Sequence, residues 1–210
     1  MPPKIVLASS SPRRRELLEK VGIRFSVIPS LLDEIPREDE TPHNFALRAS
    51  KEKAIAVARD QNSDCVVIGA DTIVVINGEI LGKPRDEEDA RFILKKISGR
   101  EHKVITGFSI ARPKMEVLHR EFVESRVKIK ILAPWEIEGY INTKEPMDKA
   151  GAYGVQGIGA FMVQEIYGSY TNVVGLPLAQ LVGALTKLGI LKLFSEDEYS
   201  SKPKKGPREN

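Results

Sequence analysis

Short apolar runs alternate with amphipathic segments along most of this 210-residue chain. Runs rich in β-branched and aromatic residues predict strands at residues 4–8, 24–28 and 65–70. Two shorter runs, 73–76 and 79–81, flank Asn77 and Gly78, a dipeptide typical of a tight β-hairpin. The hydrophobic pattern therefore predicts a sheet whose first strands come early in the chain.

Amphipathic segments bounded by capping residues predict the helices. We expect helices at residues 16–22, 42–60, 86–98, 134–142 and 178–188. Asp86 opens the third of these with acids in the first turn, and Gly99 follows its last lysines, an order that suits the helix dipole. Strand-like segments at 103–111, 122–132 and 160–166 complete the alternation, which is that of an α/β protein.

The composition is that of an ordinary globular protein, with 41% hydrophobic and 29% charged residues. The length suits one large domain or two closely joined lobes. A net charge of +3 favours a phosphate-bearing ligand but is far below that of a protein that coats nucleic acid. Cys65 is the single cysteine, so no intrachain disulfide can form. Because we find neither a membrane-spanning stretch nor the apolar stretch of a signal peptide, we expect a cytoplasmic protein.

The most informative segment is the turn between the first strand and the first helix, which reads SSSPRRR over residues 9–15. Hydroxyls, backbone N–H groups and arginine forks can together bind phosphate, and anions bind where a strand passes into a helix. The alternative is a helix start, with Ser11 as the cap, Pro12 in the first turn and the arginines on a solvated face. Cations are unfavourable at the positive end of a helix, which favours an anionic partner. We interpret the segment as a polyphosphate cradle.

Carboxylates provide the second candidate group. Asp71 directly follows the apolar run 65–70, so we expect it at the carboxyl end of a strand, where α/β enzymes place metal ligands and general bases. The alternative is an aspartate that only forms a tight corner. Asp33 and Glu34 lie in an irregular acidic stretch, and one of them beside Asp71 would make an oxygen site for Mg²⁺ or Mn²⁺.

No Cys-His or Ser-His-Asp set can be argued from the order of residues alone. The three histidines are scattered, and we find no Walker P-loop and no GxGxxG motif. Among the lysines, Lys83 is suggestive because it lies in a Gly-Lys-Pro loop rather than on a helix face. The sequence thus offers basic side chains that can bind phosphate and carboxylates that can bind a divalent metal. This combination indicates metal-assisted attack of water on a phosphoanhydride.

Five segments in order resemble the Maf-like nucleotide pyrophosphatases, over residues 4–188: LASSSPRRRELL, IGADTIVVINGEILGKP, LKKISGREHKVITG, EPMDKAGAYGVQG and GSYTNVVGLPL. The resemblance implies a metal-dependent cytosolic enzyme, commonly a dimer, that cleaves a nucleoside triphosphate to the monophosphate and pyrophosphate. It also implies an elongated mixed sheet flanked by helices, in two lobes with a cleft, similar to inosine triphosphate pyrophosphatase. We therefore expect one domain at residues 1–190 and a flexible polar tail at 191–210.

The resemblance also implies roles for individual residues. The family's phosphate-contacting serine and arginines fall on Ser9, Arg13 and Arg14 of this sequence. Its lysines fall on Lys53 and Lys83. The acidic metal-binding position falls on Glu34. The catalytic aspartate falls on Asp71, which would act as general base on the attacking water, directly or through the metal.

Three positions divide the family by preferred base, and here they are Arg13, Thr72 and Gln156. This combination resembles the branch that acts on dTTP and UTP, often also on modified pyrimidine nucleotides, rather than the branch that acts on 7-methyl-GTP. The Gln156 amide can both donate to and accept from the carbonyl–imide–carbonyl edge of such a base. By its pattern alone, Gln156 is a polar residue of a glycine-rich turn.

Two other functions compete with this one. A nucleic-acid-binding or cell-division regulatory protein could use the arginines as phosphate contacts, but it would have no use for Asp71 and Glu34 beside them. A phosphomonoesterase also combines cations, carboxylates and a metal, and it would release orthophosphate rather than pyrophosphate. We expect a nucleotide substrate, a divalent metal and a homodimer, and neither nucleic acid nor a membrane as a partner.

Overall fold

The computed structural model describes residues 3–32, 34–61 and 64–193. The strands are β1 (Lys4–Leu7), β2 (Ser26–Val27), β3 (Cys65–Ile76), β4 (Glu79–Leu81), β5 (Glu101–Arg112), β6 (Glu116–Ile129) and β7 (Val163–Tyr167). The α-helices are α1 (Pro12–Lys20), α2 (Pro42–Ala58), α3 (Glu87–Ile97), α4 (Pro134–Asn142), α5 (Tyr170–Val174) and α6 (Leu178–Lys187). Short 3-10 helices are η1 (Pro113–Met115), η2 (Glu145–Asp148), η3 (Ala150–Ala152) and η4 (Ile158–Met162).

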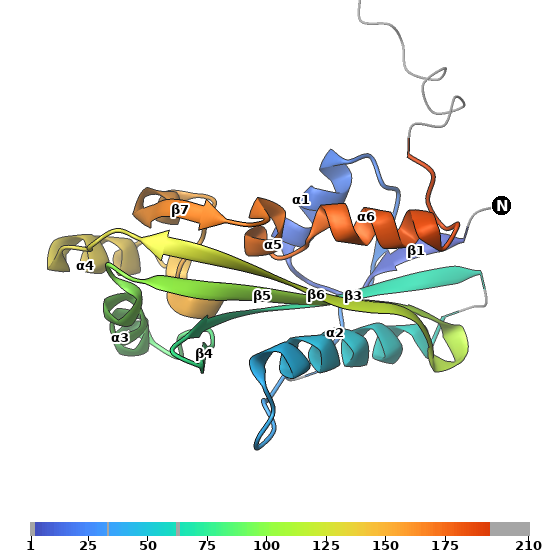
Figure 1. The fold of residues 1–210 in the computed structure, drawn as a ribbon, viewed down its shortest axis with the longest axis horizontal. Helices are drawn as coiled ribbons and strands as arrows, with labels where there is room; N and C mark the ends of the chain where they lie inside the picture. The colour runs from blue at the N-terminus through green and yellow to red at the C-terminus, as the bar shows by residue number, and fades with distance from the viewer. Residues whose placement is uncertain (1–2, 33, 62–63, 194–210) are drawn as a thin grey trace, which may run out of the picture.

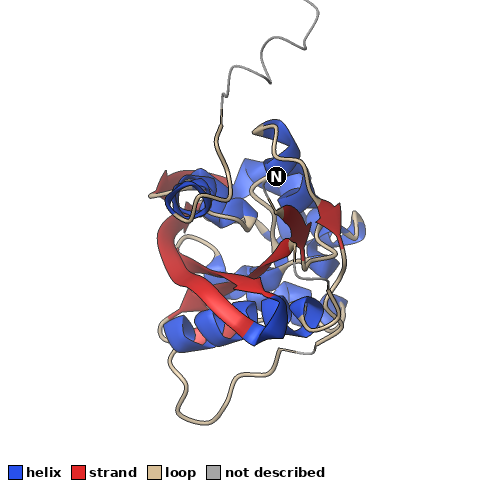
Figure 2. Ribbon diagram, turned by 90° about the vertical axis from the view of Figure 1, so that its right-hand side faces the viewer, coloured by secondary structure: helices blue, strands red, loops and turns tan. Residues whose placement is uncertain are grey.

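All seven of these strands form one mixed sheet in the order β2-β1-β3-β5-β6-β7, with β4 paired to β3. β1 is parallel to β2 and β3, whereas the remaining pairs are antiparallel. The long strands β3, β5 and β6 run along the length of the molecule, with α2 on one face and α1, α5 and α6 on the other (Figure 1). The view along the long axis shows how strongly the sheet twists (Figure 2). The expected α/β class with a central mixed sheet and flanking helices is confirmed.

Two glycines let α2 pack unusually close to the sheet. A Cβ on Gly69 of β3 would lie 2.2 Å from the Ser50 carbonyl oxygen, and one on Gly107 of β5 would lie 2.2 Å from that of Ala46. Only a residue without a side chain fits at either place. The close approach brings Lys53, one turn further along α2, beside the middle of β3.

Two hydrophobic cores lie at opposite ends of the long strands. At one end α3 and α4 pack on the sheet, with Leu94 and Ile141 buried among strand residues. At the other end α1 and α6 pack on the sheet through Leu18 and Leu185. The two-lobed organisation implied by the resemblance stays a prediction.

The edge of β3 that faces β1 has a gap. β1 pairs with residues 65–68 of β3, and β4 pairs with residues 74–76. Within the described part of the chain, residues 69–73 have no strand on that side, although they pair with β5 on the other. The prediction that Asp71 ends a strand is therefore wrong: β3 continues to Ile76, and Asp71 lies at the gap in the sheet edge.

Other boundaries also differ from the sequence expectations. The first helix begins at Pro12, so the arginines occupy its first turn, and Ser11 caps it without a side-chain hydrogen bond. β6 begins six residues earlier than expected, because the connection from β5 is only Pro113–Met115. The short helix α5 was not predicted at all. Asp33 and most of the expected tail, residues 194–210, lie outside the described residues.

Candidate active site

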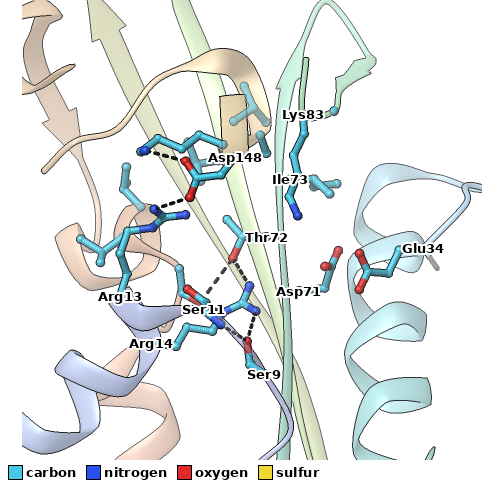
Figure 3. Close-up of a pocket in the computed structure, with 18 of the residues that line it drawn as sticks. Ser9, Ser11, Arg13, Arg14, Glu34, Asp71, Thr72, Ile73, Lys83 and Asp148 are labelled. Atoms are coloured by element: carbon cyan, nitrogen blue, oxygen red, sulfur yellow. Dashed lines mark hydrogen bonds and ion pairs between the residues drawn. The ribbon is translucent and has the colours of Figure 1, made fainter. Parts of the chain in front are cut away.

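A cavity of about 660 Å³ lies between the two cores. The turn after β1, the start of α1, the middle of β3 and the loop after β4 line it, together with η2, η3 and the end of α5. The side chains of Ser9, Arg13, Thr72, Asp71 and Lys83 meet there from segments far apart in the sequence (Figure 3). The volume is within the range of small-molecule sites.

The first turn of α1 supplies the cationic wall. β1 is buried and ends at Leu7, and Pro12 starts the helix five residues later, so Ser9 and Arg13 face the cavity. The Arg13 side chain is 27% exposed and forms an ion pair with Asp148 on the opposite wall, with Nη1 to Oδ2 at 3.3 Å. Lys83 is exposed and extends toward the cavity from the loop after β4 (Figure 3).

Arg14, next along the helix, is buried, unlike its neighbours. Its guanidinium donates to Ser9, Thr72 and Gly175, so it lies in the wall rather than across the opening. Burial lowers the pKa of the Arg14 guanidinium, and the charges of Asp71 and Glu34 oppose that effect.

A pair of carboxylates forms the facing wall. Asp71 is 6% exposed, and its Oδ1 accepts a hydrogen bond of 2.8 Å from Nζ of Lys53. The same ammonium forms an ion pair with Glu34, which lies in the irregular segment before α2. Lys53 is itself buried on the face of α2 that packs against β3. One cation thus gathers two carboxylates that are 37 residues apart in the sequence.

These two carboxylates fit a divalent metal ion of the kind the resemblance implies. Oxygen atoms of Asp71 and Glu34 converge on one cationic group, Lys53, and oxygens are the ligands that Mg²⁺ and Mn²⁺ prefer. Among the described residues, no group of three or more acidic, histidine or cysteine side chains is arranged for a metal. A metal that takes one or two protein carboxylates and completes its shell with phosphate oxygens and water suits such a site.

The wall opposite Arg13 comes from the segment EPMDKAGAYG. Asp148 accepts from Lys149 Nζ at 2.7 Å as well as from Arg13. Partial burial alone would raise the pKa of Asp148, but these two cations lower it below its usual value. Glu145 holds the glycine-rich loop, because its carboxylate accepts from the backbone N–H groups of Ile158 and Gly159.

A buried pair stands behind this wall. Nε2 of His102 lies 2.8 Å from the Tyr153 hydroxyl, and Tyr153 lines the cavity. Burial lowers the pKa of His102 to about 4, so the imidazole is neutral at pH 7. Burial also raises the pKa of the Tyr153 hydroxyl. The pair therefore packs and hydrogen-bonds as two neutral rings.

The cavity brings together most of the residues singled out in the sequence. Those that line it are Ser9, Arg13, Arg14, Glu34, Lys53, Asp71, Thr72 and Lys83. Gln156 does not line it, although its neighbour Val155 does. Sequence reasoning missed Asp148, Lys149 and Tyr153 as site residues, and the signal that could have found them was the polar and aromatic content of the motif beside Gln156.

Comparisons with known proteins agree over nearly the whole chain. Residues 4–188 match the family model described as Maf-like protein. The dTTP/UTP pyrophosphatase of Clostridioides difficile (strain 630) is 50% identical over 190 residues, which cover 90% of this chain and 97% of the relative. That of Syntrophus aciditrophicus (strain SB) is 50% identical over 196 residues, covering 93% and 95%.

Among solved structures, the Ham1 protein of Staphylococcus aureus is similar with a TM-score of 0.43 and 19% identity, covering 76% of this chain and 79% of that one. In the described residues, no helix has the length and apolarity needed to cross a bilayer.

Proposed function

The chain belongs to the Maf-like protein family, and from that premise we propose that it hydrolyses dTTP and UTP to the nucleoside monophosphate and pyrophosphate. Two relatives that are half identical to it carry the name dTTP/UTP pyrophosphatase. The observation that supports the proposal most is the cavity in which Arg13 and Lys83 face the carboxylates gathered by Lys53. Phosphoanhydride hydrolysis needs cations for the polyphosphate and carboxylates for the attacking water or a metal.

Asp71 acts as the general base in this proposal. Its carboxylate, oriented by the hydrogen bond from Lys53, accepts a proton from water as the water oxygen bonds to the α-phosphorus. The oxygen that bridges the α- and β-phosphates then leaves with pyrophosphate. Ser9, Arg13 and Lys83 bind the phosphate oxygens and hold the triphosphate in line for this displacement. Arg13 binds them in exchange for its ion pair with Asp148.

Glu34 and Asp71 are the residues that would hold a divalent cation. A bound Mg²⁺ or Mn²⁺ would neutralise phosphate charge and lower the pKa of the attacking water. Lys53 then shares these carboxylates with the cation and keeps both directed at the same place.

Base choice rests on Arg13, Thr72 and Gln156. The amide of Gln156 can pair with the carbonyl–imide edge of thymine or uracil, and of pyrimidines modified elsewhere on the ring. Gln156 is next to the lining residue Val155, and the proposal requires a movement of this loop that brings the Gln156 amide to the cavity. Thr72 lies on the wall between Asp71 and Arg14.

The organisation of the protein follows from the same premise. We propose that residues 1–190 form one two-lobed catalytic domain, that the enzyme is a homodimer and that it works in the cytoplasm. Light scattering after size exclusion tests the dimer, with a mass of one chain as the result that would refute it.

The decisive experiment measures products. The purified chain is incubated with dTTP, UTP, CTP and GTP in the presence of Mg²⁺ or Mn²⁺, and pyrophosphate, orthophosphate and nucleoside monophosphate are each quantified. We expect equal amounts of pyrophosphate and monophosphate, with dTTP and UTP the best substrates. Orthophosphate alone would indicate a phosphomonoesterase, and nucleic-acid binding without turnover would indicate a binding protein.

Two variants sharpen that experiment. Asp71→Asn removes the base and should lower kcat at least 100-fold while the far-UV circular dichroism spectrum is retained. Asp64→Asn changes an exposed aspartate beside the start of the same strand and should leave turnover unchanged. Near-normal turnover by Asp71→Asn would remove Asp71 from the mechanism.

A further inference from the structure

Three segments of the site meet at one buried side chain, Arg14. Its Nε donates to the Gly175 carbonyl at 2.8 Å, its Nη1 to the Ser9 hydroxyl at 2.9 Å and its Nη2 to the Thr72 hydroxyl at 3.0 Å. Ser9 belongs to the turn after β1, Thr72 to the gap in β3, and Gly175 follows α5. Arg14 itself is 9% exposed. Three of its five N–H groups thus donate hydrogen bonds to other residues of the protein.

The Thr72 hydroxyl is equally committed. Besides Arg14, it lies 2.9 Å from Thr106 Oγ1 and 3.3 Å from the Gly175 carbonyl oxygen. Thr106 has a single hydroxyl proton and donates it to the backbone carbonyl of Asn172 at 3.0 Å. The single hydroxyl proton of Thr72 can be given to Thr106 or to the Gly175 carbonyl, and a connected series of hydrogen bonds runs from Arg14 through Thr72 and Thr106 into α5.

The far end of this series is fixed in the sheet. Nδ2 of Asn172, which is fully buried, donates to the Val104 carbonyl at 3.1 Å and to the Ser125 hydroxyl at 3.0 Å. Those two residues lie on β5 and β6. The Arg14 guanidinium is thus linked through hydrogen bonds to three neighbouring strands.

The adjacent Arg13 behaves differently. Its side chain is 27% exposed and that of its partner Asp148 is 62% exposed, so a triphosphate can displace that contact at little cost. To bind phosphate through the fork that includes Nε, Arg14 would have to give up its hydrogen bond to the buried Gly175 carbonyl, which is expensive when that acceptor stays unpaired.

We propose that Arg14 is a positioning residue, which fixes the phosphate-binding turn at Ser9 against Thr72 of β3 and the Gly175 carbonyl, instead of a ligand of the triphosphate. The inference rests on the proposed function. Its consequence is that the hydroxyl of Thr72 acts on the reaction through this hydrogen-bonded wall, by keeping Asp71 in register with the phosphates that Ser9 holds.

Steady-state kinetics of Arg14→Lys and Thr72→Val, with inorganic pyrophosphate as a competitive probe of the phosphate site, tests this. Lysine keeps the charge but loses the three-way fork, and valine keeps the shape of threonine without its hydroxyl. We expect each variant to lower kcat for dTTP about 10-fold or more, because misplacement by about 1 Å is enough for such a loss. The inhibition constant of pyrophosphate should stay within about threefold of wild type. The double variant should be no more than about threefold worse than the poorer single variant, since both changes break one unit.

Two controls frame the result. Lys83→Ala, which removes a proposed phosphate ligand, should raise the pyrophosphate inhibition constant about 10-fold. Arg15→Lys changes the exposed arginine next to Arg14 and should alter nothing.

A 10-fold rise of the pyrophosphate constant in Arg14→Lys would make Arg14 a phosphate ligand and overturn the proposal. An unchanged kcat in Thr72→Val would overturn it as well, and this variant serves if Arg14→Lys does not fold. Failure of the proposed function is distinguishable, because wild type itself would then release no pyrophosphate.

Discussion

Mild acid is expected to destabilise this protein through one residue, His102. The side chain is 2% exposed, its Nε2 pairs with the Tyr153 hydroxyl, and its buried Nδ1 has no hydrogen-bond partner among the described residues. Burial lowers its pKa from 6.5 to about 4. An imidazolium at this place would carry a charge in a site that offers it no carboxylate contact in the described structure, so the folded protein keeps the ring neutral.

The sign and size follow from linkage. Above pH 6.5 the ring is neutral in both the folded and the unfolded chain and contributes nothing to the pH dependence. Between pH 6.5 and about pH 4 only the unfolded chain takes up the proton, so the free energy of unfolding decreases as the pH is lowered. At about 1.4 kcal/mol per pH unit, the loss is about 2 kcal/mol at pH 5 and about 3 kcal/mol at pH 4.

Urea denaturation at pH 7, 6 and 5 measures this loss in wild type and in His102→Gln, whose side chain is polar but does not ionise. Carboxylates contribute equally to both proteins, so the difference between their pH profiles isolates the histidine. Wild type should lose about 2 kcal/mol more than the variant over this interval. His119→Gln, at a partly exposed histidine on β6, should keep the wild-type profile. Identical profiles for wild type and His102→Gln would refute the reasoning.

Three further outcomes are expected. Gly107→Ala places a Cβ 2.2 Å from the Ala46 carbonyl oxygen and should lower the free energy of unfolding, measured by urea denaturation, by more than about 2 kcal/mol. Gly183→Ala, at an open position of α6, should not lower it. Equal stabilities of the two variants would contradict the close approach of α2. Glu34→Gln should raise the Mg²⁺ concentration for half-maximal pyrophosphate release about 10-fold, and an unchanged metal dependence would remove Glu34 from the metal site. Gln156→Ala should change kcat/KM for UTP relative to CTP several-fold with little change in Tm, and an unaltered ratio would mean that its amide does not reach the base.

Local pattern predicted much of the fold. The helix expected at residues 134–142 has those bounds, and the hairpin at Asn77 and Gly78 joins β3 to β4. The length of β3 could not be predicted from the sequence, because Asp71 and Thr72 interrupt the apolar run in a way that usually marks a strand end. Their polar side chains are accommodated by the gap in the sheet edge, which depends on where β1 stops and β4 begins.

The site was predictable in its chemistry but not in its assembly. Three serines and three arginines indicated phosphate, and the acids indicated a metal or a base. That Lys53 gathers Glu34 and Asp71 could not be read from spacing, since it depends on α2 packing against Gly69. The different fates of Arg13 and Arg14 depend on burial alone, which one helical step of about 100° determines.

The strands that carry the site also limit how the enzyme can move. β3 supplies Val66 and Ile68 to one core and Val74 and Ile76 to the other, so no flexible linker separates these two cores along this strand. Domains joined by loop residues close by rotation about a hinge, but here closure would have to bend continuous, hydrogen-bonded strands. The enzyme therefore adjusts to its substrate by elastic twisting of the sheet and by loop and side-chain movement, and unliganded and liganded forms should differ little in the backbone of β3, β5 and β6.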